Sequence, residues 1–435
     1  MLRRPRLALF TLWLLVFAAA GQIIVVAPIL PRIGEQLAVA EGPLGLLITV
    51  YAAALAVFTL VVGPVSDRYG RRRVILVGAA AMAAVLLAHG WARSFESLLV
   101  LRALAGAAGG VLSGASVAYV GDTFPPERRG WANGWVMSGF AVGQILGIPL
   151  GIALADGFGF RAPFVGFGLA MVAAFVLAFP ALPQPPGATS GAPLTLGGAL
   201  GGYRALLRGP ATRAAAVVFL VLFAGVGLFV VYFPTWLERS LGFSAAGVSA
   251  VYALGGLANV LTGPPAGRLS DRVGRQPVIV GASVGLGALM VLTPLTEAAP
   301  PLAYVAFCGI MALAAARISP LQALLTELVA ADRRGSFMSL TTASGNVGFA
   351  AGSALAGALY AAAGFGANAA VAGAAALLGA ALVWRLLPVE RQVERADPAL
   401  ADAADRPVPT ALAGPAPEAG HMAEAASPPR QRGAA

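Results

Sequence analysis

The stretch GPVSDRYGRRRVI at residues 63–75 recurs as GRLSDRVGRQPVI at residues 267–279, which lie 204 residues further along the chain. Eight of the 13 aligned positions are identical. The tripeptide RRG at residues 128–130 also recurs, at residues 333–335 and an offset of 205. Arginines scattered among loops would not reproduce this order at this spacing. The sequence therefore predicts an internal repeat, in which two similar halves follow one another.

The composition predicts a membrane protein. Hydrophobic residues make up 58% of the 435 residues, charged residues make up 11%, and the mean hydropathy is +0.81. Soluble domains carry roughly 25% charged residues. We predict an all-α polytopic membrane protein whose twelve transmembrane helices form two pseudo-symmetric six-helix bundles, because each apolar block is long enough to cross the ~30 Å core of a bilayer. The expected spans are residues 7–30, 43–65, 74–92, 97–120, 131–155, 162–180, 213–237, 244–266, 277–297, 301–326, 336–362 and 367–387.

The placement of arginines predicts the orientation, because positively charged residues concentrate in cytoplasmic loops. Most loop arginines lie on one side of the expected spans, and the other side carries only Arg32, Arg93, Arg161 and Arg239. We therefore expect a bacterial inner-membrane protein with an uncleaved first helix and with both termini in the cytoplasm. The expected parts are an N-terminal bundle (1–180), a cytoplasmic linker rich in Pro and Gly (181–212), a C-terminal bundle (213–390) and a disordered cytoplasmic tail (391–435).

Residue content excludes several classes of protein. All 29 basic residues are Arg, so the chain lacks the Lys of a Walker ATP-binding loop and the Lys of a Schiff base. His89, His421 and the single Cys308 lie far apart, so we expect no metal and no cofactor. The sequence shows no nucleophile paired with a general base, so we expect that the protein is not an enzyme. The arginines lie in short loops without interleaved aromatic residues, which argues against a nucleic-acid partner.

The motifs resemble those of the major facilitator superfamily, over nearly all of residues 5–390. GPVSDRYGR at residues 63–71 is similar to that family's G-x-x-x-D-R-x-G-R sequence between spans 2 and 3, and Arg102 is similar to its span-4 arginine. GQILGIPLG at residues 143–151 resembles the antiporter motif of exporters, although Pro149 comes two residues after Gly147 instead of directly after it. This variant looks closer to sugar- and drug-efflux permeases of the arabinose-efflux type. The resemblance implies parallel repeats and a substrate site near the bilayer midplane.

The resemblance also implies a gating role for the repeated motif, because in the family this cluster is taken to latch the cytoplasmic side of the outward-open state. We place Asp67 near a helix start, where an anion is favoured and can accept hydrogen bonds from Arg71 or from a neighbouring helix. A topology signal without a latch is the alternative. The gating candidates are Asp67, Arg68, Gly70, Arg71 and Asp122, with a second copy at Asp271, Arg272 and Arg275.

Span 5 carries small residues at a regular spacing, Gly143, Gly147 and Gly151, with Pro149 as a possible kink. Small residues spaced in this way let helix backbones approach closely and slide past one another. We interpret these residues as a hinge, with static helix packing as an equal alternative.

Two arginines, Arg102 and Arg317, fall inside apolar spans, where a charge is costly and usually faces a cavity. The middle of each expected span lacks Asp and Glu, so neither arginine has an obvious partner. An anionic substrate would supply one, and backbone carbonyls or helix-to-helix contacts are the alternatives. The family architecture places spans 1, 4, 7 and 10 around the cavity, which adds substrate-binding candidates on these and flanking spans: Gln22, Tyr232, Gln144, Gln322, Asn259 and Asn346.

Together these features predict a secondary active transporter that works by alternating access and exports a small organic solute or drug-like compound. We expect its substrate to be anionic or amphiphilic. Coupling to protons is left open, because span 1 offers Gln22 in place of a carboxylate. The alternatives are an importer of an organic-acid metabolite and a transporter-derived sensor that moves no solute. We expect a monomer in the lipid bilayer.

Overall fold

The first half of the chain is a series of long helices. The computed structural model describes residues 5–112, 119–120, 122–183, 196–329 and 333–387, and residues 1–389 form one compact unit. The helices of the first half are α1 (Pro5–Ile24), α2 (Val26–Leu37), α3 (Glu41–Leu44), α4 (Leu46–Tyr69), α5 (Arg71–Ala88), η1 (His89–Trp91), α6 (Phe95–Leu112), α8 (Pro126–Phe158) and α9 (Arg161–Ala181).

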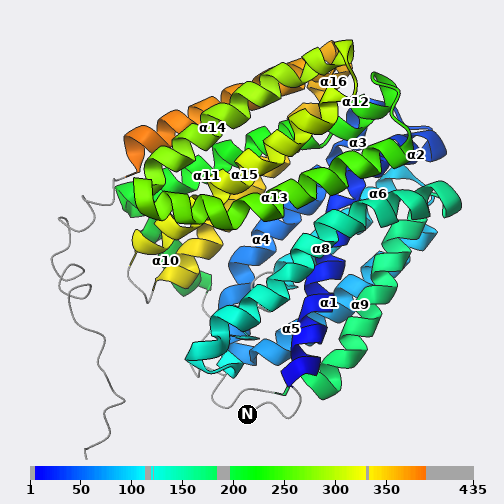
Figure 1. Ribbon diagram of the computed structural model, residues 1–435. Helices are drawn as coiled ribbons and strands as arrows, with labels where there is room; N and C mark the ends of the chain where they lie inside the picture. The colour runs from blue at the N-terminus through cyan, green and yellow to red at the C-terminus, as the bar shows by residue number, and fades with distance from the viewer. Residues whose placement is uncertain (1–4, 113–118, 121, 184–195, 330–332, 388–435) are drawn as a thin grey trace, which may run out of the picture. The chain divides into compact units, whose positions relative to one another are not determined.

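The second half repeats this pattern after a short helix in the expected linker. That helix is α10 (Leu196–Arg208), and the half continues with α11 (Pro210–Val230), α12 (Phe233–Arg239), α13 (Ala245–Val273), α14 (Arg275–Leu292), η2 (Thr293–Ala298), α15 (Leu302–Glu327) and α16 (Arg334–Leu386). Figure 1 shows the long helices of each half lying side by side.

The longest element, α16, is a hairpin of two helices. Gly364 has φ 71° and ψ −176°, which is outside helical geometry. Asn368 Nδ2 donates to Ala356 O at 3.0 Å, although a straight helix would separate residues twelve apart by roughly 18 Å. Eleven helices are long and apolar enough to cross a membrane when α16 is counted once. With α16 counted as two, the described part of the chain contains the twelve apolar spans that the sequence predicts.

The repeated motif forms the ends of helices. α4 runs to Tyr69 and α13 runs to Val273, beyond the expected ends at 65 and 266. Gly70 (φ 90°) and Gly274 (φ 96°) then turn the chain into the next helix, in a conformation that favours glycine. The expectation that Asp67 lies near a helix start is therefore wrong: the position lies in the last turn of α4, because the helix continues until Gly70 ends it. The side chain of Asp67 lies outside the described part of the structure.

Glycines of spans 5 and 11 bring their helices into backbone contact with a neighbour in the same half. On α8, a Cβ added at Gly139 would lie 2.5 Å from Trp13 O of α1, and one at Gly143 would lie 3.2 Å from Phe17 O. On α16, a Cβ at Gly348 would overlap Leu220 O of α11. Spans 5 and 11 thus pack on spans 1 and 7 in the same way, with glycines at the closest approach.

The two halves meet along α4 with α16 and along α8 with α13. They also meet at one end of the bundle, where α2, α3 and α12 cluster (Figure 1). We call this the Arg32 end and the opposite end, where α4 turns into α5, the Arg71 end. Near the Arg32 end, one buried apolar cluster continues from Val25 and Ile29 into Phe229 and Phe233 of the second half. The apolar residues of the second half at its Arg71 end form a separate cluster.

Candidate functional site

The buried Arg102 contacts an amide and two aromatic rings of its own half. Its side chain on α6 is only 1% exposed, and Nη1 donates to Gln22 Oε1 on α1 at 2.8 Å. Gln22 Nε2 in turn donates to the Tyr51 hydroxyl on α4 at 3.1 Å. The guanidinium carbon lies 4.4 Å from the Tyr51 ring centroid and 5.7 Å from that of Phe164. Nε of Arg102 is buried and has no hydrogen-bond partner among the described residues.

His89, at the end of α5, contacts Phe164, the same ring that Arg102 contacts. Its Nδ1 lies 2.8 Å from Val85 O, and its ring stacks on Phe164 with the centroids 4.4 Å apart. The ring is fully buried, and Nε2 has no hydrogen-bond partner in the described ranges. This histidine is therefore part of the packing between α5 and α9.

Arg317 on α15 is almost as buried as Arg102, at 3% exposed, but its surroundings are different. Its Nε has no hydrogen-bond partner, and the described residues supply no other hydrogen bond, ion pair or ring contact to its guanidinium. The neighbouring buried side chains on the same stripe of α15 are apolar: Ile310, Leu321 and Leu324. Arg317 is a buried cation that lacks a counter-charge in the described structure.

The other substrate-binding candidates do not form one cluster. Asn259 Nδ2 donates to Met311 O at 3.1 Å and ties α13 to α15. Gln322 has a buried Oε1 without a partner among the described residues, and Gln144 and Asn346 are half-buried on α8 and α16. Among the predicted candidates, the structure brings only Arg102 and Gln22 into direct contact.

Tyr232 lies at the Arg32 end, where it joins the two halves. Its hydroxyl lies 2.7 Å from Glu41 O and 3.0 Å from Gly42 O, and it accepts from Gly45 N at 3.0 Å. Its ring stacks on Tyr360 with the centroids 4.7 Å apart. The hydroxyl is thus occupied by the backbone of the first half.

Ion pairs cross between the halves at the same end. Arg32 bonds Asp156 of its own half and Glu238 of the other half, the second at 2.8 Å. Burial alone would lower the pKa of Arg32, but its hydrogen bonds with Asp156 and Glu238 raise that pKa above the ordinary value. Arg239 of the second half pairs with Glu41 at 2.6 Å and with Glu35 at 3.4 Å. Sequence reasoning missed this network, although Arg32 and Arg239 are two of the four arginines on the Arg-poor side.

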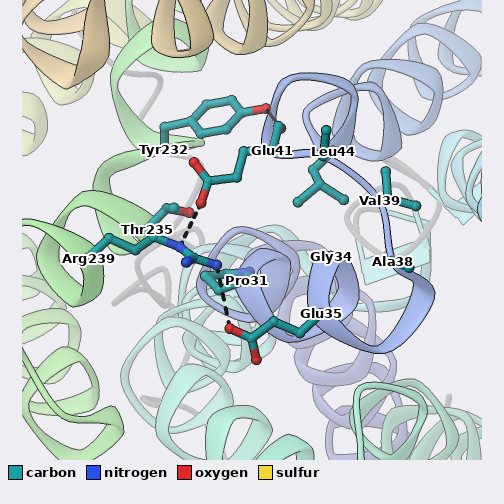
Figure 2. A pocket seen from close by; sticks show the side chains of 11 residues that line it. Pro31, Gly34, Glu35, Ala38, Val39, Glu41, Leu44, Tyr232, Thr235 and Arg239 are labelled. Atoms are coloured by element: carbon teal, nitrogen blue, oxygen red, sulfur yellow. Dashed lines mark hydrogen bonds and ion pairs between the residues drawn. The ribbon is translucent and has the colours of Figure 1, made fainter.

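A cavity of ≈ 350 Å³ lies beside this network (Figure 2). Pro31, Glu35 and Leu44 of the first half line it, together with Thr235 and Arg239 of the second. Figure 2 shows the Arg239 guanidinium between the carboxylates of Glu35 and Glu41. Part of the cavity lining is therefore made of residues that hold the halves together.

Two ion pairs at the Arg71 end each lie inside one half. Arg71 Nε lies 3.1 Å from Asp122 Oδ2, and Arg71 also donates to Ser66 Oγ at 3.0 Å. In the second half, Arg275 pairs with Glu327. Asp122 and Glu327 are 205 residues apart, so this pairing belongs to the internal repeat, although the sequence analysis did not include Glu327 in the second gating copy. Arg68, Asp271 and Arg272 are exposed, and the latch role of the motif stays a prediction.

The three glycines among the hinge candidates on α8 face α1 and the residue that follows it. A Cβ at Gly147 would lie 3.2 Å from Gly21 Cα, and one at Gly151 would overlap Val25 of the first half. Pro149 lies inside the helix, which continues to Phe158. The contacts place these residues at a tight interface, and their movement stays a prediction.

Known proteins are similar to this chain over most of its length. The family model described as Major Facilitator Superfamily matches residues 12–261 and 215–421. The uncharacterized MFS-type transporter YceJ of Bacillus subtilis is 26% identical over 80% of this chain and 89% of its own length. The multidrug resistance protein MdtG of Yersinia enterocolitica is 26% identical over 68% of this chain and 72% of its own. The crystal structure of a D-xylose-proton symporter superposes with a TM-score of 0.74 at 18% identity, covering 89% of this chain and 98% of the symporter, which is evidence for the fold alone.

Proposed function

The chain belongs to the Major Facilitator Superfamily, and from this premise we propose that it is an efflux permease for small organic solutes. The observation that carries the proposal is the cross-half network of Arg32, Glu238, Arg239 and Tyr232, which holds two repeated bundles together at one end. Alternating access requires two bundles that rock against each other, and therefore contacts at one end that can form and break.

Two further features support export. The α8 sequence at residues 143–151 resembles the antiporter motif of exporters, and its glycines lie against α1. MdtG, which matches over about two thirds of the chain, carries the name multidrug resistance protein. We assign the Arg32 end to the periplasm and the Arg71 end to the cytoplasm of a bacterial inner membrane, because the arginine-rich side of a multi-pass protein is cytoplasmic. Both termini and the segment 181–212 are then cytoplasmic.

Transport assays in membrane vesicles of opposite orientation test direction and coupling together. An exporter accumulates its drug-like solute in everted vesicles, and a protonophore abolishes the accumulation when protons drive it. An importer accumulates its solute in right-side-out vesicles instead. Absence of movement in both orientations, for lipophilic cations, neutral sugars and organic anions alike, would overturn the transporter assignment in favour of a sensor.

A further inference from the structure

The two buried arginines of the membrane region differ in how their charge is compensated. Arg102 has a strong acceptor in Gln22 and two aromatic faces, those of Tyr51 and Phe164. Arg317 is almost as buried as Arg102, but the described residues offer its guanidinium no hydrogen-bond acceptor and no aromatic ring. A buried charge without a partner is strongly destabilising, so a protein retains one where an external group completes the pair.

The position of Arg317 on α15 limits what that group can be. Ile310, Arg317, Leu321 and Leu324 recur at intervals of seven, four and three residues, so they form one stripe of the helix, and all four are buried. The stripe is apolar on both sides of a single cation. These apolar side chains are packed in the cores of the protein, Ile310 in one buried cluster and Leu321 and Leu324 in the other, so a ligand that reaches Arg317 meets one cation in apolar surroundings. Such a ligand carries one negative charge, because a second would itself be left uncompensated.

We propose that Arg317 recognises the substrate as a singly charged organic anion, a monocarboxylate with an apolar body. The planar guanidinium matches a carboxylate with two parallel hydrogen bonds, which fixes orientation as well as charge. The long side chain lets the guanidinium swing away from the stripe to meet the anion while its methylene groups stay packed. Arg102, by contrast, is a positioning residue that holds α1, α4 and α6 together. The inference rests on the proposed transport function and names its substrate class.

Ligand-free stability tests the claim that Arg317 has no internal partner. In detergent, Arg317→Met should raise the melting temperature by about 2–4 °C, because an apolar side chain of similar length replaces an uncompensated charge. Arg102→Met is the matched control and should lower the melting temperature, because it removes the hydrogen bond to Gln22. If Arg317→Met lowers the melting temperature as far as Arg102→Met does, Arg317 has a protein partner and the inference is overturned.

Three probes with one apolar body then test the charge: 2-naphthoate, 2-naphthamide and 2-naphthylmethylammonium. Only the naphthoate should raise the melting temperature of the wild-type protein, in a concentration-dependent way. The rise should vanish in Arg317→Met and survive in reduced form in Arg317→Lys, which keeps the charge and loses the planar fork. Equal shifts from all three probes, no shift from the naphthoate, or an unchanged shift in Arg317→Met would each overturn the inference.

Counterflow in proteoliposomes distinguishes a wrong substrate class from a wrong transport function. If the amide or the ammonium probe is exchanged and the carboxylate is neither bound nor exchanged, the protein is a transporter and the anion assignment is wrong. If the carboxylate binds through Arg317 and is exchanged, both stand. If it binds and nothing is exchanged, the anion site stands and the transport function fails.

Discussion

At the scale of single residues, the first half of the protein stabilises its buried charge by a hydrogen bond to a neutral amide. Gln22 uses both ends of its side chain, because Oε1 accepts from Arg102 and Nε2 donates to the Tyr51 hydroxyl. A carboxylate in the same place would bind a proton or form a salt bridge, whereas the amide does neither at any physiological pH. Any proton coupling must therefore use a group other than this pair.

Replacing Gln22 by Leu should expose how much this amide contributes. The variant leaves the Arg102 guanidinium without its acceptor, so unfolding should become easier by about 1.5–3 kcal/mol, the range for hydrogen bonds to charged groups. Thermal melting of the purified protein in detergent measures the change. Gln144→Leu, at a half-buried amide on α8, is the control and should melt close to the wild type. An unchanged melting temperature for Gln22→Leu would contradict the pairing.

The sequence marks Arg102 and Arg317 as unusual for the same reason, namely that each is a charge in an apolar span. It cannot show that Arg102 has an acceptor and that the described residues offer none to Arg317. Gln22 and Arg102 are 80 residues apart, and their contact depends on how α1 and α6 are rotated about their own axes. Rotation of a helix that is apolar on all faces leaves no trace in its hydropathy pattern.

At the scale of helices, glycines decide which faces meet. α8 carries glycines on two faces, and the structure distinguishes them: Gly139 lies against the backbone of α1, while Gly134 has nothing within 4 Å of an added Cβ. The regular spacing of small residues predicted a close helix contact from the sequence. The partner helix could not be predicted from it, because the spacing is a property of α8 alone.

Alanine at these two glycines should have opposite effects. Gly139→Ala should destabilise the protein by about 1–3 kcal/mol, because the new methyl group would lie 2.5 Å from Trp13 O and the helices must move apart. Gly134→Ala should be neutral or should stabilise by up to about 1 kcal/mol, because alanine is the better helix former and has free space. Thermal melting of both variants compares them within one helix. Equal effects would mean that α8 does not pack on α1 as described.

At the scale of the whole molecule, the repeat and the spans could be predicted, but the contacts between the halves could not. Hydropathy identified twelve apolar spans, because each must match the thickness of a bilayer. The pairing of Arg32 with Glu238 joins residues 206 apart in the sequence, and it belongs to one arrangement of the halves. The same sequence encodes every relative position of the two halves that transport requires. No local sequence pattern therefore identifies the contacts that belong to the position seen in this structure.

Tyr232→Phe should loosen the Arg32 end. The change removes the hydroxyl that accepts from Gly45 N and bonds the Glu41 carbonyl, so the arrangement joined at this end should lose about 1.4 kcal/mol, a tenfold change in population. The measurement is the rate at which a membrane-impermeant maleimide labels Thr235→Cys in a Cys308→Ser background. Thr235 is 2% exposed and lines the cavity, so labelling reports opening.

The control is Tyr252→Phe, because the buried Tyr252 hydroxyl has no partner among the described residues. It should leave the labelling rate unchanged, while Tyr232→Phe raises it about tenfold. Labelling at the wild-type rate in both variants would show that the tyrosine bridge does not hold this end closed.

The chain reverses direction at the single residue Gly364, and this affects how the protein is inserted into the membrane. No loop separates the two helices of α16, so there is no polar segment for the insertion machinery to carry across the membrane between them. We therefore expect the last two spans to enter the lipid together as one hairpin. The hydrogen bonds from Asn368 to the carbonyls of Leu228 and Ala356 then form only after both helices of the hairpin have been made.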